Sequence, residues 1–195
     1  MNKIALLTLL SALAFGNLHA QAVYKIDKAS PIGMKLSGTS TFHDWDMNAK
    51  SFTGDAKFGF KPENAKQLVS ISALSFCLHV LDLKSDETAL DNNAYKALKT
   101  GTYRDIVYTL SSSAVVQQPA GNYLVKTQGW LTIAGVTKGI AMDVLCTVNP
   151  DAGITCKGSK SLKMTDYNVK PPSFMAGVMK TGDDITLDFN MVYKK

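Results

Sequence analysis

The segment DDITLDFNMVY, residues 183–193, decides the fold class. Apolar side chains occupy every second position of it, at Ile185, Leu187, Phe189, Met191 and Tyr193. Polar side chains lie between them, at Asp184, Thr186, Asp188 and Asn190. Successive side chains of a strand point to opposite faces of the sheet, so this alternation predicts a half-buried antiparallel strand.

The same alternation recurs along the chain, in residues 24–26, 32–42, 52–60, 68–81, 105–112, 122–133, 138–148 and 154–161. Short turn sequences separate these runs, namely KPENAK, QQPAGN, IAGVTKG and NPDAG. Such short connections favour sequential antiparallel pairing. In residues 68–81 the apolar phase changes near Ala73, which indicates a β-bulge. The chain is therefore predicted to be an all-β single domain.

One short helix is expected among these strands, in the segment LDNNAYKALKTG, residues 90–101. Asp91 can cap its start, and Gly101 follows its end in the usual stop position. Ala94, Tyr95 and Leu98 give it an apolar face.

So many strands in one domain must close into a barrel or stack as a sandwich. A barrel of about eight strands either just fills its interior with side chains or holds one small ligand. Three of the predicted inward faces have a glycine part-way along, at Gly38, Gly54 and Gly129. We interpret these small residues as a hollow, although they could instead mark bends or bulges in a filled sheet. An elongated apolar hollow suits a long apolar chain.

The first 22 residues are typical of a secretory signal peptide. Lys3 precedes an apolar run, and cleavage is predicted after Ala20 or Ala22. Residues 23–195 then form the exported domain, most simply in a bacterial periplasm. No other segment approaches the roughly 20 apolar residues of a spanning helix, so no stable membrane insertion is expected.

The charge pattern does not favour nucleic-acid binding. The formal net charge is +5, which becomes +4 when Lys3 is removed with the signal peptide, and the lysines are scattered. Neither charge nor composition indicates the oligomeric state.

Four segments, in this order, resemble the YceI-like family of exported lipid-binding proteins: YKID (24–27), GTSTFHDWDM (38–47), LTIAGVTKGIAMDV (131–144) and LKMTDYNVKPPSFMAGVMKTGDDITLDF (162–189). The resemblance runs from residue 23 to the C-terminus. It implies an extended antiparallel β-barrel of lipocalin-like shape, with an isoprenoid or similar amphiphile along an apolar pore. The segment 84–98 departs from the family's usual Arg-Asp pair and histidine, so the kind of lipid stays open.

Together these observations predict a periplasmic carrier that sequesters an isoprenoid or another long-chain, for example fatty-acyl, amphiphile, without a cofactor. The candidate ligand-binding residues at the cavity and its mouth are Phe42, Trp45, Phe52, Gly54, Phe58, Phe76, Tyr108, Gly129, Leu131, Met142, Phe174, Met175 and Phe189. Phe174 and Met175 lie in the apolar segment 169–179, which either plugs the barrel or covers it as a lid. The alternative function is a ligand-free interaction or structural module of the envelope.

His43 and Asp44 raise a further alternative, a metal-dependent enzyme, because a carboxylate can orient an imidazole for proton transfer. The sequence contains neither a G-x-S-x-G elbow nor an H-E-x-x-H motif, and His79 is isolated in a predicted strand. We therefore expect a structural or ligand-facing role for His43, with no catalytic residue, no metal site and no enzymatic activity.

Two of the three cysteines flank a turn in the segment CTVNPDAGITC, residues 146–156. If residues 149–153 form the loop, Cys146 lies directly opposite Cys156. The pair forms either a disulfide, in an oxidising compartment, or two buried thiols. Cys77 is then unpaired and expected to be buried.

Overall fold

The structure is a computed structural model that describes residues 22–29, 33–174 and 178–195. The predicted signal peptide, apart from Ala22, and the candidate residue Met175 lie outside the described residues. The strands and helices are β1 (Val23–Ile26), β2 (Gly33–Ser40), β3 (Trp45–Ala49), β4 (Thr53–Lys61), β5 (Asn64–His79), η1 (Val80–Asp82), β6 (Leu83–Lys84), α1 (Thr88–Ala97), β7 (Asp105–Gln117), η2 (Pro119–Gly121), β8 (Asn122–Ile133), β9 (Val136–Val148), β10 (Ile154–Lys163), η3 (Met164–Tyr167), β11 (Ser173–Phe174) and β12 (Met179–Lys194).

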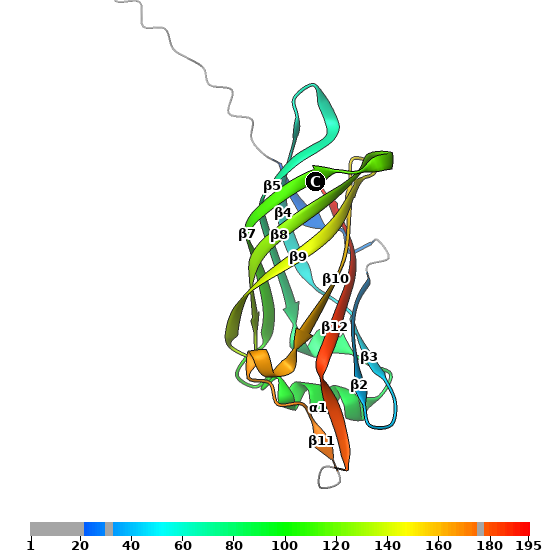
Figure 1. Ribbon diagram of the computed structural model, residues 1–195, viewed down its shortest axis with the longest axis vertical. Coiled ribbons are helices and arrows are strands. Elements are labelled where there is room, and N and C mark those ends of the chain that lie inside the picture. The colour runs from blue at the N-terminus through cyan, green and yellow to red at the C-terminus, as the bar shows by residue number, and fades with distance from the viewer. Residues whose placement is uncertain (1–21, 30–32, 175–177) are drawn as a thin grey trace, which may run out of the picture.

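Eight antiparallel strands form a ring in the order β1-β4-β5-β7-β8-β9-β10-β12, and β1 pairs with β12 to close it. The ring is a long barrel whose strands run along the long axis of the molecule (Figure 1). The predicted single extended antiparallel barrel of about eight strands with one short helix is therefore confirmed.

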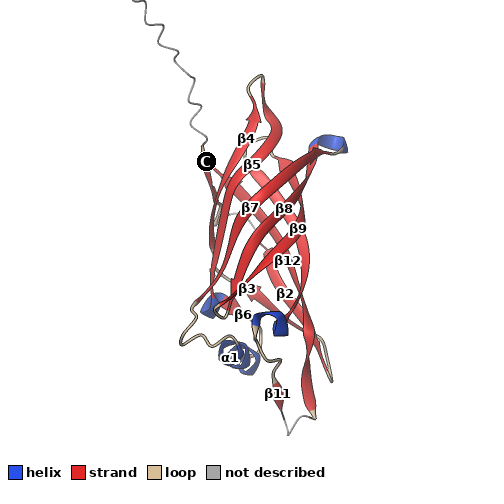
Figure 2. Ribbon diagram, turned by 60° about the vertical axis from the view of Figure 1, so that its left-hand side comes forward, coloured by secondary structure: helices blue, strands red, loops and turns tan. Residues whose placement is uncertain are grey.

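The seam of the barrel is closed in two parts. At the end near the C-terminus, β1 meets β12 through Lys25↔Lys194 and Ile26↔Tyr193. Further along β12, β2 takes over as its neighbour, and β3 and β6 extend the sheet beyond β2. A single short strand could not span this long barrel, and the β2–β3 hairpin supplies the rest of the wall (Figure 2).

Strand registers agree with the alternation of the sequence. The apolar residues 185–193 of β12 face the interior and the residues between them do not. In β5 the register shifts between Lys57↔Ala73 and Phe58↔Ile71, so Ser72 is the extra residue of the expected bulge. In the turn after β9, Val148 pairs with Ile154, which places Cys146 opposite Cys156 as predicted.

The barrel is solid at the end near the C-terminus. Tyr24 packs edge-on against Phe58 with 5.2 Å between ring centroids, and Phe58 packs against Tyr193 at 5.6 Å. All three rings are almost completely buried. These aromatic contacts close this end of the interior.

The interpretation of the inward glycines as gaps was wrong. A Cβ on Gly129 would lie 2.4 Å from the Tyr108 ring, and one on Gly38 would lie 2.4 Å from the Trp45 ring. At Gly54 the space is taken by Ile26, whose Cδ1 would be 2.6 Å away. Neighbouring side chains therefore cover each glycine, and the interior space has another origin.

Helix α1 lies across the other end of the barrel (Figure 2). It begins one turn earlier than predicted, and Asp91 is not its cap. The buried Asp91 carboxylate instead accepts hydrogen bonds from the Ser85 amide at 2.7 Å and the Ser85 hydroxyl at 2.8 Å. Lys84 lies 3.5 Å from the same carboxylate. Asp91 therefore fastens the helix to the strand segment before it.

The segment after η3 is more regular than a simple loop. The two prolines are followed by β11, whose Ser173 pairs with Lys180 and whose Phe174 pairs with Met179 of β12. Val169 is buried, and Pro172 lies against the interior near α1. The described part of this segment covers the α1 end of the barrel.

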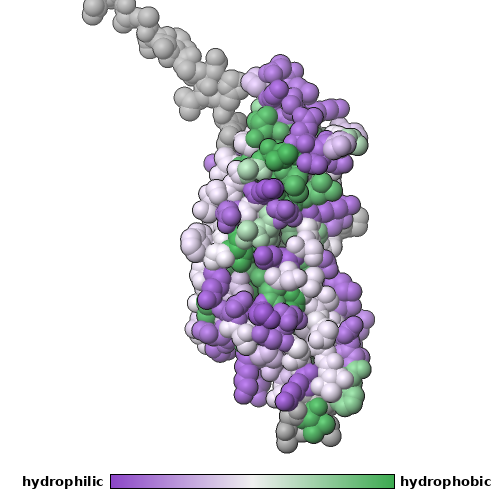
Figure 3. Space-filling view, viewed as in Figure 1, coloured by the Kyte–Doolittle hydropathy of each residue, from purple (hydrophilic) through white to green (hydrophobic). Residues whose placement is uncertain are grey.

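Polar side chains are spread over the whole outer face in Figure 3, with apolar patches mainly on its upper half. Exposed apolar residues include Val116 and Leu145 on the outer faces of β7 and β9. The larger apolar side chains gather inside the ring.

Candidate functional site

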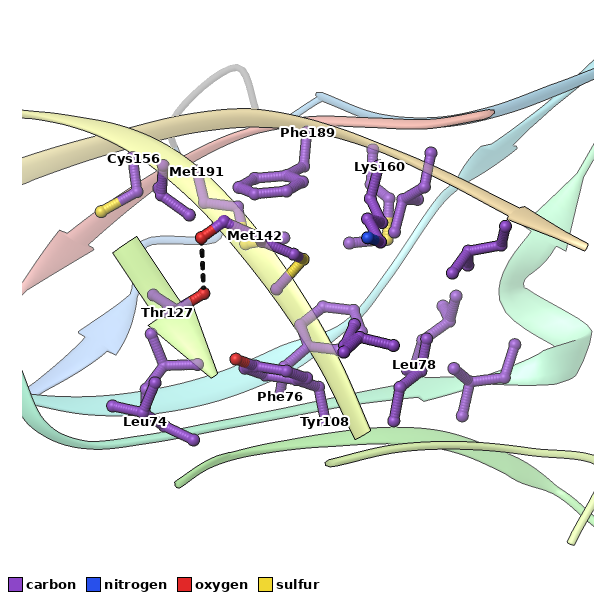
Figure 4. A pocket seen from close by; sticks show the side chains of 18 of the residues that line it. Leu74, Phe76, Leu78, Tyr108, Thr127, Met142, Cys156, Lys160, Phe189 and Met191 are labelled. Atoms are coloured by element: carbon purple, nitrogen blue, oxygen red, sulfur yellow. Dashed lines mark hydrogen bonds between the residues drawn. The ribbon is translucent and has the colours of Figure 1, made fainter. Parts of the chain in front are cut away.

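The interior between the aromatic end and α1 is hollow. It holds a cavity of about 160 Å³ whose walls come from β2, β5, β7, β8, β9, β10 and β12. Leucine, isoleucine, methionine and phenylalanine dominate the lining. Figure 4 shows these side chains pointing into one common space from opposite walls.

A second hollow of about 90 Å³ continues the first toward the helix. Both are lined by Leu36, Leu83, Leu98, Ile133 and Ile185. The second is completed by α1, η3 and Pro172, which lie over the end of the barrel. The apolar space thus extends from the middle of the barrel to the underside of α1.

Six of the candidate ligand-binding residues line this space. Phe76, Tyr108, Leu131, Met142 and Phe189 line the larger cavity, and Trp45 lines the smaller one. They come from six different strands, so only the tertiary fold brings them together. Their contact with a ligand stays a prediction.

The other candidates lie elsewhere. Phe42 is 65% exposed at the turn between β2 and β3. Phe52 and Phe58 are buried but pack against other rings of the core. Gly54 and Gly129 lie behind Ile26 and Tyr108, and do not line either hollow. The side chain of Phe174, like Met175, is outside what the structure describes.

Several lining residues were missed. Leu74 and Leu78 share the inward phase of β5 with Phe76, and alternation alone could have found them. Leu98 follows the end of α1 and reaches the cavity only because the helix folds over the barrel. Lys160 lies on the inward face of β10, where a charged residue gives no apolar signal.

Few polar groups face the larger cavity. The Thr127 hydroxyl donates a hydrogen bond to the Met142 carbonyl at 3.0 Å and is thereby satisfied (Figure 4). The Tyr108 hydroxyl is buried and has no hydrogen-bond partner among the described residues. Burial raises the pKa of Tyr108 above its ordinary value, so the phenol keeps its proton. The Lys160 side chain is the third polar group of the lining.

The two described histidines, His43 and His79, do not form a reactive cluster. His43 is exposed, and its Nδ1 lies 2.9 Å from the carbonyl oxygen of its neighbour Asp44. His79 lies at the end of β5 and its Nδ1 is 3.0 Å from an Asp105 carboxylate oxygen. Within the described ranges, no three His, Cys, Asp or Glu side chains are grouped as metal ligands. His43 therefore has local contacts at the turn after β2.

Cys146 and Cys156 are free thiols with their sulfur atoms 3.1 Å apart. Hydrogen bonding to Cys146, together with burial, raises the pKa of the Cys156 thiol. Cys77 is also free and only partly buried. The two cysteines for which the sequence allowed a disulfide thus have their sulfur atoms in contact. That oxidation joins them stays a prediction.

A sequence profile described as the YceI-like domain matches residues 24–193. The chain belongs to the YceI-like family. This assignment agrees with the motif resemblance, and the match covers almost all of the described YceI-like barrel.

Solved structures share the fold of this YceI-like chain. BcnA of Burkholderia cenocepacia has a TM-score of 0.66 at 16% identity, with 86% of this chain and 98% of BcnA covered. A polyisoprenoid-binding domain from Saccharophagus degradans, implicated in plant cell wall breakdown, has a TM-score of 0.65 at 15% identity, with coverages of 88% and 97%. The YceI protein of Campylobacter jejuni has a TM-score of 0.56 at 19% identity, with coverages of 100% and 99%. At these identities the likeness concerns the fold.

No curated protein matches this YceI-like chain. In the part of the chain that the structure describes, no helix has the length and apolar character needed to cross a membrane.

Proposed function

We propose that this protein binds one long-chain amphiphile, an isoprenoid or a fatty-acyl lipid, with its hydrocarbon part inside the barrel. The observation that carries this proposal is the apolar cavity between the aromatic end and α1. Protein interiors normally pack to high density, and an unfilled apolar space of this size costs stability unless something occupies it. A hydrocarbon chain supplies the missing contacts.

The energetics of burial are sufficient for binding without a covalent or metal anchor. Each methylene removed from water contributes about 0.8 kcal/mol. A chain of ten such groups would gain roughly 8 kcal/mol before the entropic cost of association is subtracted. The two hollows adjoin through five shared lining residues, and this succession of apolar spaces favours an extended chain over a compact metabolite.

The comparisons support the same class of ligand. The domain from Saccharophagus degradans is described as polyisoprenoid-binding, and it shares the fold. We further propose that the chain acts as a carrier in the periplasm, since its first 22 residues are typical of a secretory signal peptide. The proposal involves no chemical conversion of the lipid.

The test is the identification of a bound lipid. Protein purified without detergent is analysed by native mass spectrometry, and its organic extract is analysed for lipids. We expect an adduct of one lipid per chain, which is lost on extraction and restored when lipid is added back. A protein that carries no lipid and takes up none when dodecanoic acid, dodecanol or farnesol is offered would contradict the proposal.

A pair of variants of β9 locates the binding site. Met142→Trp adds bulk inside the cavity, whereas Leu145→Trp adds it on the outer face of the same strand. We expect the first variant to lose at least about tenfold in affinity through steric exclusion, and the second to bind like the wild type. Equal uptake by both variants would place the binding site outside the barrel.

A further inference from the structure

Lys160 is a charged residue on the inward face of the barrel. Strand β10 alternates along its length, so Cys156, Lys160 and Leu162 face the cavity while Lys157 and Lys163 are exposed. Figure 4 shows the Lys160 side chain extending from β10 into the space between the walls. Among the described residues that line the cavity, Lys160 alone carries a charged side chain.

The Lys160 ammonium has no hydrogen-bond or ion-pair partner among the described residues. Three lysines on the outer surface, Lys35, Lys163 and Lys194, each lie within 3.0 Å of a carboxylate oxygen, whereas the lining around Lys160 contains no carboxylate. Removing a cation from water without a counter-charge is costly. Lys160 is half-buried, and no other side chain of the lining carries a charge to balance its ammonium.

A second donor in the same cavity is also unsatisfied. The Tyr108 hydroxyl projects from β7, is buried, and has no partner within the described part of the chain. An ammonium has only donors to offer, and a protonated phenol offers one. Both groups would be satisfied by a ligand with hydrogen-bond acceptor oxygens, and neither fits a cationic headgroup such as an ammonium.

We infer that Lys160 binds the carboxylate of a long-chain fatty acid whose tail fills the cavity. This inference rests on the proposed function, and it names the chemical class of the ligand. A carboxylate carries a single negative charge, which one ammonium balances. A phosphate monoester carries about 1.5 to 2 negative charges near neutral pH and would leave an excess in the apolar interior. The carboxylate is therefore the better match to this lining.

The test compares three ligands with the same twelve-carbon chain: dodecanoic acid, 1-dodecanol and dodecyl phosphate. Each displaces the neutral probe N-phenyl-1-naphthylamine from the full-length mature protein at pH 8. A charge-assisted hydrogen bond contributes enough for us to expect the acid to bind about tenfold or more tightly than the alcohol. We also expect the acid to bind more tightly than the phosphate.

Two variants of β10 assign the preference to Lys160. In Lys160→Met the ratio of alcohol to acid dissociation constants should fall to about one, because methionine keeps the volume but not the charge. Lys157→Met removes an exposed lysine of the same strand and should keep the wild-type ratio. Lys160→Met should also unfold at a higher urea concentration than the wild type in the absence of lipid, since it replaces the charged side chain of an otherwise uncharged lining by an apolar one. A residue needed only for packing would not give this gain.

The outcomes separate this inference from the proposed function. If acid and alcohol bind equally to the wild type, or if Lys160→Met keeps the acid preference, the inference is wrong while lipid binding stands. Tighter binding of dodecyl phosphate than of dodecanoic acid would also overturn it, in favour of a phosphate headgroup. If none of the three ligands displaces the probe, the proposed function fails as well.

Discussion

At the scale of single residues, pairs of glycine and aromatic side chains shape the cavity wall. The Tyr108 ring lies over Gly129, and the Phe189 ring lies over Gly158, where an added Cβ would be 2.5 Å from the ring. Because glycine has no side chain, each ring can lie against the neighbouring strand. The middle of the barrel is then left free even though large side chains line it.

Replacing Gly129 by alanine tests this arrangement. The added Cβ would collide with the Tyr108 ring, and we expect a loss of about 1–3 kcal/mol in the free energy of unfolding, as is usual for overpacking. Urea denaturation measures the loss. The control is Gly139→Ala, on the strand paired with β8, where the new Cβ would make an ordinary 3.4 Å contact with Trp130. Equal stability of the two variants would show that the Tyr108 ring moves aside without cost.

At the scale of elements, one buried carboxylate connects α1, which covers one end of the barrel, to the segment before it. Burial by itself would raise the pKa of Asp91, but hydrogen bonds from Ser85 and the charge of Lys84 outweigh it, so the pKa is lowered. The carboxylate joins residues before the helix to its first turn. Without this connection the helix would depend mainly on its apolar contacts over the smaller hollow.

Asp91→Ala should therefore destabilise the protein. It leaves the Ser85 amide and hydroxyl without their acceptor, and we expect a loss of about 1–3 kcal/mol in urea denaturation. Asp86→Ala, at an exposed position of the same segment, serves as the control and should change stability little. Hydrogen exchange at the amides of α1 should accelerate only in Asp91→Ala.

The same carboxylate predicts a dependence on pH. A lowered pKa in the folded state stabilises the protein above the ordinary carboxyl pKa of about 3.9, and this contribution is lost as the pH falls through the folded value. The difference in unfolding free energy between the wild type and Asp91→Ala should thus be constant near neutral pH and shrink below about pH 4. Urea titrations at several pH values measure it. A difference that persists at pH 2 would show that the charge of Asp91 is not what fastens the helix.

At the scale of the whole molecule, the barrel is filled at one end and hollow toward the other. Aromatic rings from β1, β4 and β12 fill the first end, and α1 with the segment after η3 covers the second. A ligand that completes the core should stabilise the fold as a unit. The stabilisation grows with ligand concentration and reaches about 2.7 kcal/mol at 100 times the dissociation constant.

Dodecanoic acid at saturating concentration should therefore raise the melting temperature of the wild type. Differential scanning calorimetry measures the shift. Met142→Trp should show a much smaller shift, because its added ring takes the place of the ligand. A shift of equal size in this variant would mean that the fatty acid stabilises the protein from a site on its surface.

How far the sequence predicts the site depends on the kind of signal that each residue gives. Alternation places Phe76, Leu131 and Phe189 on the inward face, and the structure has them there. It cannot distinguish an inward residue at the solid end, such as Phe58, from one that lines the hollow. That difference depends on which side chains from distant strands meet at the same height in the barrel.

The sequence by itself determined the class of fold, the faces of the strands, the β9–β10 register and the family, because each depends on local periodicity, turn residues or motif order. Only the tertiary structure decided where the barrel is hollow. It showed that the glycines are covered by rings, that Asp91 fastens the helix, and that Lys160 faces an apolar space. The physical reason is that empty volume and unbalanced charge belong to no single strand. They arise where side chains far apart in the chain face one another across the closed ring.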